Sequence, residues 1–286
     1  MAIRREHLAP GMKVSCDQYI TSVPGRLPDT YGKENVKQQY RGGTIFYDHA
    51  SGAIFLRHQV SLQAGETVRA QRAFDQFAKQ NGVKIKSYRA DNLPFNSKAF
   101  RDDLALHDQT IDFSGVGAHH QNGVSEWLIQ TVTQWAQTMM LQASIHWPDA
   151  SNLELWPFAL AHAVYIWNHL PKRDNLLSPI ELFSGTKADN YARLQRSHVW
   201  GCPVYVLDPK LQDGKKIPKF NPRSRRGQYL GQSSAHSSTI GCILNLNTGW
   251  VSPQYHVVYD DLFTTVPNAE SGGLLDLQNF NADSWS

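Results

Sequence analysis

Apolar residues along the first two thirds of the chain follow two alternating periods, one typical of strands and one typical of helices. Short apolar runs between turn residues predict strands over 12–20, 44–48, 53–58, 83–90 and 110–113. Apolar residues at helical spacing predict helices over 64–81, 95–107, 121–143 and 153–170. The segment 21–43 is rich in Gly, Pro and charge and predicts a long loop. This order of elements predicts a mixed sheet flanked by helices, an α/β architecture.

Beyond Pro171 the pattern changes to short apolar runs separated by Gly, Pro and Asn. The runs cover residues 203–207, 228–230, 240–246 and 254–258. Such runs are typical of a small β-barrel. The chain is therefore expected to divide into an α/β core at 10–172, a linker at 173–194, a β-barrel at 195–266 and a loosely ordered polar tail at 267–286.

The composition indicates an ordinary folded protein with a buried core. Apolar residues make up 41% of the chain and charged residues 19%, and no run of eighteen apolar residues predicts a membrane span. The amino-terminal segment lacks the apolar stretch of a secretory signal. Cys16, Cys202 and Cys242 are scattered and odd in number, which favours a reducing compartment, and none stands at zinc-finger spacing. We expect a nuclear or cytoplasmic protein that is neither secreted nor held in a membrane.

Basic residues concentrate in one short segment, although the net charge of the chain is only +3. Between positions 210 and 226 seven basic residues stand against one acid, Asp213. The seven are Lys210, Lys215, Lys216, Lys219, Arg223, Arg225 and Arg226. Such a segment is either a solvated loop or a surface for nucleic-acid phosphates, and the residues alone give these two interpretations equal weight.

Three carboxylates stand where the predicted elements could bring them together. Asp17 lies on the first predicted strand, Asp91 directly follows a later strand, and Glu126 lies in the first turns of a predicted helix. Phosphoryl transfer between nucleic-acid strands needs little more than carboxylates that hold two divalent metal ions. The chain has 25 acidic residues, most of which are expected on the solvated surface. The spacing of Asp91 and Glu126, with 34 residues between them, singles out this set.

The residues around these carboxylates carry a specific resemblance. Arg-Ala-Asp-Asn at 89–92 and His-Gln-Asn-Gly-Val-Ser-Glu at 120–126 resemble motifs of the integrase core in Pol polyproteins of copia-type LTR retrotransposons. Further similar segments are Tyr-Asp-His-Ala-Ser at 47–51 and Trp-Asn-His-Leu-Pro at 167–171. Segments 198–206 and 227–231 resemble the SH3-like module that follows this core, so the resemblance reaches to about position 265.

The resemblance implies a fold, an activity and a set of partners. It implies a ribonuclease H-like core followed by an SH3-like β-barrel, with Asp17, Asp91 and Glu126 as catalytic residues that bind two Mg²⁺ or Mn²⁺ ions. The implied activity is DNA 3′-end processing and strand transfer, which inserts element DNA into a target duplex. A homo-oligomer is expected. The basic stretch would contact DNA phosphates, and His120 and Asn122 are further candidates for DNA contact, with Asn122 also expected to cap the helix that carries Glu126.

Two departures from the family pattern keep other functions open. Leu93 replaces a Gly and Trp127 replaces an Arg, and the His/His/Cys/Cys zinc module that precedes such cores is absent from this sequence. One alternative is a metal nuclease of the same fold that cleaves without joining. The other is an inactive remnant that binds DNA. The chain is expected to be part of a longer polyprotein.

Other conspicuous side chains are assigned structural roles. Asp48 is expected to support the hairpin rather than catalysis. Five aromatic residues at helical spacing are expected in the core, namely Trp147, Trp156, Phe158, Tyr165 and Trp167. The adjacent acids Asp102 and Asp103 are expected on an exposed helix face, with no role.

Overall fold

The computed structural model describes residues 8–28, 39–91, 95–114, 123–173, 176–187 and 190–266. Its first half forms a five-stranded sheet with the order β3-β2-β1-β4-β5. The strands are β1 (Val14–Gly25), β2 (Tyr40–Asp48), β3 (Ile54–Gln59), β4 (Ser87–Ala90) and β5 (Thr110–Phe113). β1, β2 and β3 pair in antiparallel fashion, whereas β4 and β5 run parallel to β1. This is the mixed sheet that the sequence predicts.

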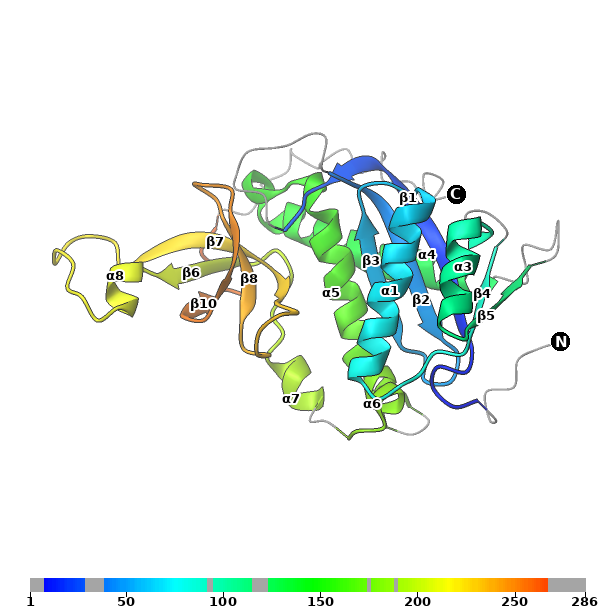
Figure 1. Ribbon diagram of the computed structural model, residues 1–286. Coiled ribbons are helices and arrows are strands. Elements are labelled where there is room, and N and C mark those ends of the chain that lie inside the picture. Colours follow the sequence, from blue (N-terminus) through cyan, green and yellow to red (C-terminus); the bar gives the residue numbers. More distant parts are fainter. Residues whose placement is uncertain are drawn as a thin grey trace.

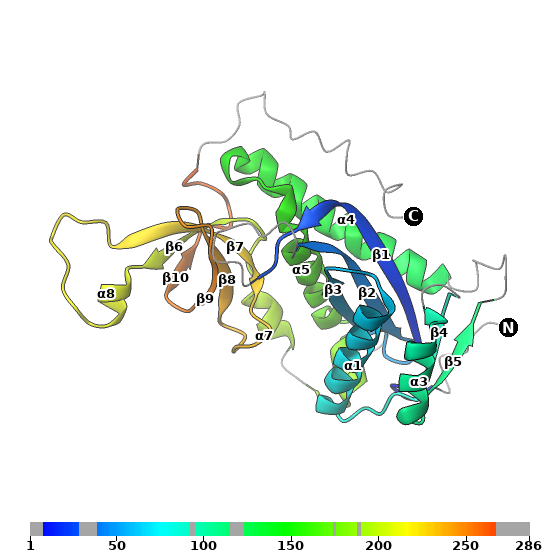
Figure 2. The same cartoon turned by 45° about the horizontal axis from the view of Figure 1, so that its top comes forward.

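Helices cover both faces of this sheet (Figure 1). α1 (Ala64–Gln80) and α3 (Lys98–Leu106) lie on one face, and α4 (Gly123–His146) and α5 (Trp156–His169) lie on the other (Figure 2). Short 3₁₀ turns at Pro148–Ala150 and Leu153–Leu155 connect α4 to α5. The short helix α6 (Pro179–Ser184) returns to the first core, where the ring of Phe183 stacks on that of Phe77 in α1. An α/β architecture with flanking helices is therefore confirmed.

Alternation along the strands separates two apolar cores. Phe46 in β2 packs with Phe74 of α1, and their rings stack with centroids 4.7 Å apart. Its neighbours Ile45 and Tyr47 point to the opposite face and pack with α4 and α5. Successive side chains of a strand point to opposite faces, so the period of two in the sequence assigns each residue to one helix layer.

The carboxyl-terminal part forms a second sheet in which all strands are antiparallel. Its order is β10-β6-β7-β8-β9. The strands are β6 (Pro203–Leu207), β7 (Ser224–Gln232), β8 (Gly241–Asn245), β9 (Val251–Gln254) and β10 (Val257–Tyr259). Two short helices accompany them, α7 (Asn190–Gln195) before β6 and α8 (Pro209–Gln212) after it. The sheet is open between β10 and β9, so the closed barrel of the sequence expectation is not confirmed.

The second sheet shares an apolar core with α4 and α5. One continuous cluster joins residues of both helices to Val204, Tyr229 and Ile243. Gly201 marks the closest approach, because a Cβ there would stand 2.5 Å from the Cβ of Ala143 in α4. Gly201 also has a φ of +81°, a conformation that other residues rarely adopt. The second sheet is thus packed onto the helix layer (Figure 1).

The predicted loop at 21–43 is wrong at both ends. β1 continues to Gly25 and β2 already begins at Tyr40, and the two residues are paired. The glycines that indicated a loop have another function: a Cβ at Gly42 would stand 2.1 Å from the carbonyl oxygen of Tyr19 on β1. Glycine in a strand here marks a close approach of two backbones rather than a turn.

Two of the acids considered from the sequence have clear structural roles. The carboxylate of Asp48 accepts bonds from the backbone N–H of Gly11 and Ser51 at 2.8 Å each, which confirms its support of the β2–β3 hairpin. Asp103 was expected to be exposed, and this is wrong. It is 3% exposed and accepts a bond of 2.8 Å from Nε of Arg72 on α1. Asp103 therefore ties α3 to α1.

Three further sequence expectations concern cysteines, membranes and aromatic residues. All three cysteines are free, and Cys16 and Cys202 are buried. No helix in the described ranges is both long enough and apolar enough to span a membrane.

The indole rings of Trp147 and Trp156 are buried in the core, as expected. Phe158 and Trp167 pack against the same cluster while partly exposed.

Asn168 fastens the edge of the first sheet to α5. Its side-chain oxygen accepts a bond of 2.9 Å from the backbone N–H of Ile54, and its side-chain nitrogen donates to the carbonyl of Ile54 at 2.7 Å. β3 is an edge strand, so these backbone groups have no neighbouring strand to pair with. The side-chain amide of Asn168 therefore forms the two hydrogen bonds that a further strand would otherwise form with Ile54.

Asn168→Ala is expected to lower the free energy of unfolding by about 1–3 kcal/mol, because it leaves a buried N–H and a buried C=O without partners. Denaturant unfolding at neutral pH measures this. The exposed Asn221 offers a matched control, since Asn221→Ala removes no side-chain hydrogen bond that the described structure contains. Equal stability of wild type and Asn168→Ala would contradict the role assigned to this side chain.

Candidate functional site

Asp17 projects from β1 toward the face of the sheet that α4 and α5 cover. Val14 and Cys16 belong to the core beneath α1 and α3, whereas Tyr19 belongs to the core beneath α4 and α5. Alternation places Asp17 on the same face as Tyr19. One of its carboxylate oxygens accepts a bond of 2.8 Å from the backbone N–H of Gln18. This bond fixes the direction of the carboxylate.

The parallel pairing of β1 and β4 brings Asp91 level with Asp17. Val14 pairs with Tyr88 and Ser15 with Arg89. Continuing this register by two residues sets Asp17 beside Asp91, which directly follows β4. Strand pairing thus brings two acids that are 74 positions apart in the sequence to the same level of the sheet.

Glu126 approaches from the helix layer. It lies in the first turn of α4, is exposed, and belongs to a helix that packs on β1. Burial is the largest cause that raises the pKa of Asp17, and the negative charges of Glu126 and Asp91 also raise it while the Gln18 N–H lowers it; the net result is a shift from 3.8 to about 7. The charges of Glu126 and Asp91 therefore act on Asp17, and the expectation that the three acids form one catalytic set stays a prediction.

The donor set fits a divalent cation of the magnesium type. Magnesium prefers hard oxygen ligands and a few carboxylates, and a cation between these acids would offset the repulsion and desolvation that raise the pKa of Asp17. Within the described ranges, no three Asp, Glu, His or Cys side chains lie close enough to one another to hold an ion together. The three acids are related by their charges and by strand register rather than by ligand contact.

Three residues of the predicted site region, His120, Asn122 and Leu93, lie outside the described residues. The roles of His120 and Asn122 in DNA contact, and of Asn122 in helix capping, stay predictions. Trp127 is described. Its side chain is 53% exposed, and its ring meets that of Trp167 edge-on with centroids 6.0 Å apart. Trp127 therefore packs against the neighbouring helix. Its indole is uncharged and cannot form an ion pair with a DNA phosphate.

The basic stretch forms the connection between β6 and β7. This connection contains α8 and projects away from the rest of the molecule in both views (Figures 1 and 2). Six of the seven cationic residues are exposed, and Arg225 is half-buried on β7. Arg226 lies with its guanidinium 5.6 Å from the ring centre of Trp147, at the end of α4. Arg226 therefore also serves the contact between the second sheet and the helices.

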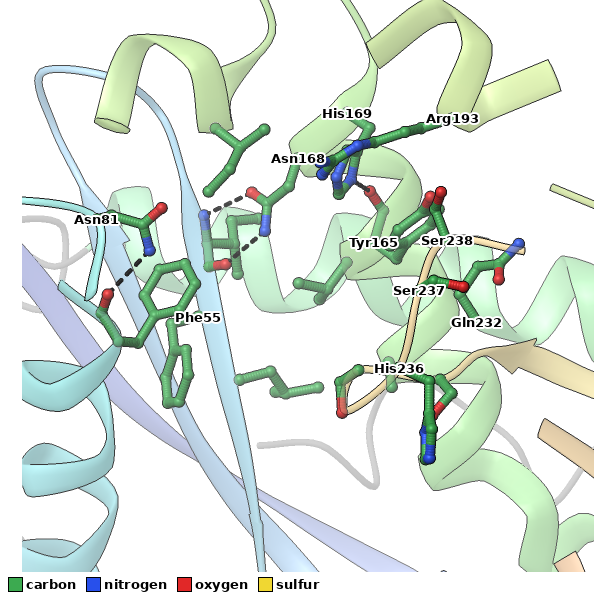
Figure 3. A pocket seen from close by; sticks show the side chains of 18 of the residues that line it. Phe55, Asn81, Tyr165, Asn168, His169, Arg193, Gln232, His236, Ser237 and Ser238 are labelled. Atoms are coloured by element: carbon green, nitrogen blue, oxygen red, sulfur yellow. Dashed lines mark hydrogen bonds between the residues drawn. The ribbon is translucent and has the colours of Figure 1, made fainter. Parts of the chain in front are cut away.

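A groove of about 770 Å³ lies elsewhere, between β3, α5 and the β7–β8 connection (Figure 3). Phe55, Tyr165 and His236 are among its lining residues, and Arg193 is its permanent cation within the described chain. No Asp or Glu of the described residues lines it. The groove is therefore separate from the three carboxylates.

Phe220 was not among the residues predicted from the sequence, yet it stands in the basic stretch with 95% of its surface exposed. The burial of Asp103 was not predicted either. A signal for Phe220 was present, since an aromatic residue in a segment without strand or helix periodicity has no predicted core to enter. No comparable signal existed for Asp103, whose partner Arg72 is remote in sequence.

The chain is homologous to parts of retrovirus-related Pol polyproteins from plant transposons. The protein from transposon RE1 of Arabidopsis thaliana is 33% identical over 142 residues, which are 49% of this chain and 8% of that protein. The protein from transposon RE2 of the same plant is 28% identical over 162 residues, which are 56% of this chain and 10% of that protein. The chain spans about a tenth of the length of these curated relatives. No protein-family model matches it.

Solved structures that this chain resembles include retroviral integrases. One is the simian T-cell lymphotropic virus intasome in complex with the PP2A regulatory subunit B56 gamma, at 16% identity, with 90% of this chain and 81% of that chain covered and a TM-score of 0.45. Another is the HTLV-2 integrase catalytic core domain in complex with magnesium, at 16% identity, with 62% of this chain and 98% of that chain covered and a TM-score of 0.41.

Proposed function

We propose that the chain is the integrase part of a copia-type retrotransposon Pol polyprotein, a metal-dependent DNA strand transferase whose catalytic residues are Asp17, Asp91 and Glu126. The observation that carries the proposal is the parallel register of β1 and β4, which directs Asp91 toward Asp17. The charges of Asp91 and Glu126 raise the pKa of Asp17, which supports their proximity to it. The homology to Pol polyproteins supports the same conclusion.

Each acid has a distinct part in holding the ions. Two Mg²⁺ or Mn²⁺ ions would supply the in-line alignment and charge neutralisation that displacement at a phosphorus atom requires. Asp17 is half-buried, and the Gln18 N–H holds one of its oxygens, so the other oxygen is presented in a fixed direction. Asp91 continues a strand and Glu126 begins a helix, so both stand on rigid elements. The exposure of Glu126 leaves room for a DNA strand on the open side.

The substrates of this function are DNA duplexes. The carboxylates would act on the 3′ end of element DNA, first with water in end processing and then with the DNA 3′-hydroxyl in strand transfer to a target duplex. The exposed cations between Lys210 and Arg226 would contact phosphates without regard to sequence. A homo-oligomer would bring two element ends together. The division into a ribonuclease H-like core, a linker at 173–194 and an SH3-like module at 195–266 belongs to this proposal.

Trp127 favours a second candidate, an inactive remnant that still binds DNA. The family motif has an Arg beside the catalytic Glu, and here an indole packs on Trp167 instead. The loss of one cation weakens phosphate contact beside the site. The three acids themselves are retained, so the remnant ranks behind the active enzyme.

A strand-transfer assay with Mn²⁺ separates these functions. The substrate is a labelled duplex of element-end sequence, incubated with an unlabelled target duplex. Joined products are expected if the chain is an integrase. Shortened but never joined products would indicate a nuclease, and DNA binding without either product would indicate the remnant.

A further inference from the structure

We propose that Phe220 is a base-stacking residue, which binds an unpaired base of DNA while the cations around it hold the flanking phosphates. The proposal rests on the proposed DNA function and adds a contact to it. It concerns the connection between α8 and β7, at positions 213–223, which lies on the opposite side of the molecule from β4 and β5 (Figure 1).

The backbone presents Phe220 at the apex of a turn. The N–H of Asn221 donates to the carbonyl of Pro218 at 3.1 Å, so Lys219 and Phe220 occupy the two central positions of that turn. Pro218 and Pro222 flank these positions and restrict the backbone on both sides. A ring held out in this way loses little conformational freedom when it binds.

The exposure of Phe220 is the largest of any large hydrophobic side chain in the described part of the chain. It is 95% exposed, and Leu262 follows at 81%. Single exposed apolar residues are ordinary on protein surfaces. The exposure of Phe220 differs because the ring stands at the centre of a hydrogen-bonded turn between two prolines, in a connection rich in exposed cations.

The charges around the ring indicate a nucleic-acid ligand. Lys215, Lys216, Lys219 and Arg223 are exposed in the same connection. The single acid, Asp213, lies 3.3 Å from Lys215, which offsets its charge. A groove or loop with cations beside an aromatic ring is the usual combination for single-stranded nucleic acid, because the cations bind phosphates and every base has a face to stack on.

A lipid surface fits these observations less well. Membrane-surface segments usually place several apolar residues along one side of a helix. Phe220 stands alone, outside any helix, with lysines before it and arginines after it. An unpaired base needs only one ring, and stacking on it requires no unstacking of a duplex.

The connection is closed at its base and can act as a rigid arm. The N–H of Asp208 donates to the carbonyl of Arg223 at 2.8 Å, and the N–H of Lys215 donates to the carbonyl of Lys210 at 2.8 Å. The arm continues directly into the β6–β7 pair, where Leu207 lies opposite Ser224. Binding at Phe220 would thus be transmitted to the sheet that packs on α4 and α5.

The test measures binding of a fluorescein-labelled dT20 strand, and of a blunt duplex of the same length, by anisotropy without divalent metal. Phe220→Ala is expected to weaken dT20 binding by about fivefold to a hundredfold, as loss of one stacked base does. Phe220→Trp is expected to retain the affinity, and Phe220→Leu to bind as weakly as Phe220→Ala. The blunt duplex should bind all variants with similar affinity.

The dependence on salt separates the ring from the cations around it. The logarithm of the dT20 binding constant should fall linearly with the logarithm of the salt concentration. Lys219→Gln should make the slope of this line shallower by about 0.7, whereas Phe220→Ala should leave the slope unchanged. Unchanged dT20 affinity of Phe220→Ala, or full affinity of Phe220→Leu, would overturn the proposal. An equal loss of affinity for the blunt duplex would also overturn it, because the ring would then act as a wedge between paired bases. So would binding to phosphatidylserine vesicles that depends on Phe220 while DNA binding is unaltered.

The outcome is independent of the proposed catalytic function. If wild type joins DNA ends and the Phe220 variants bind dT20 normally, only the base-stacking inference fails. If the Phe220 variants lose affinity as expected and no strand transfer occurs, the stacking site stands and the integrase activity fails. None of the three Phe220 variants should unfold the protein, because the ring is almost wholly in solvent.

Discussion

Glu126→Gln is expected to reduce metal-dependent strand transfer by at least about a hundredfold. The amide has the size of the carboxylate but no charge, and it cannot offset the charge of a divalent cation. Loss of a residue that merely orients a metal ligand costs about 10–100-fold, so loss of a ligand should cost more. The assay is the joining of labelled element-end DNA to a target duplex, measured as an initial rate with Mn²⁺ and again with Mg²⁺.

The matched control for this variant is Asp102→Asn. Asp102 is an exposed acid on α3 and belongs to no interaction that the described structure contains. Its variant should join DNA at the wild-type rate, which excludes a general effect of removing negative charge. If Glu126→Gln joined DNA as fast as Asp102→Asn, Glu126 would have no place in the catalytic set.

Asp17→Asn is expected to stabilise the metal-free protein at pH 8 while it removes strand transfer. Burial and the charges of Glu126 and Asp91 raise the pKa of Asp17 to about 7, so the ionised carboxylate costs the folded state free energy. The difference from the pKa of 3.8 corresponds to at most about 4 kcal/mol, and solvent screening reduces this to about 1–3 kcal/mol. The neutral amide avoids that cost and can still accept the Gln18 N–H bond.

The pH dependence follows from the direction of the shift. The folded protein retains a proton on Asp17 between about pH 4 and pH 7, whereas the unfolded chain has already released it. The stability of metal-free wild type should therefore fall across this window relative to Asp17→Asn. Below pH 4 both states are protonated, and the two proteins should be equally stable.

Thermal unfolding between pH 4 and pH 8, with EDTA present, measures this difference. Asp102→Asn is again the matched control and should follow the wild-type curve. Addition of Mg²⁺ at pH 8 should stabilise wild type, because the cation offsets the charge that destabilises it. A less stable Asp17→Asn at pH 8, or a constant difference between the proteins at all pH values, would contradict the assigned cause.

Local sequence patterns predicted the strands of the first sheet as short apolar runs, because helices cover both faces of the sheet and residues on both sides of a strand are apolar. Ile45, Phe46 and Tyr47 in β2 fall on alternate faces, as the pattern requires. The pattern failed at Gly42, where the residue type indicates a turn but the neighbouring strand requires a position without a side chain. Closeness of two backbones is a property of the pairing and cannot be seen in one strand alone.

The sequence allowed the candidate residues of the site to be chosen, but it did not allow the contacts between them to be predicted. The positions of Asp17 on a strand and Glu126 at a helix start follow from local patterns, and the resemblance selected them among 25 acids. The register that sets Asp91 level with Asp17 depends on parallel pairing between segments 74 residues apart. Long-range pairing of this kind is absent from local periodicity, and the same reason hid the contact of Asp103 with Arg72.

For the second sheet, the strands were predicted but the way they assemble was not. Its strands were predicted from short apolar runs, but closure into a barrel depends on whether β9 meets β10, and they do not pair. Packing against α4 and α5 covers one side of the sheet instead. Apolar runs indicate that a face is buried without indicating which element buries it.

The central claim is that Asp17, Asp91 and Glu126 form one divalent-cation site, and Mn²⁺ titration calorimetry tests it most directly. The titration is performed at pH 8, above the pKa of Asp17, on wild type, Asp17→Asn, Asp91→Asn, Glu126→Gln and Asp102→Asn. The account predicts Mn²⁺ binding to wild type and to Asp102→Asn, and affinity about tenfold or more weaker in each of the other three. Wild-type affinity in all three of those variants would contradict it.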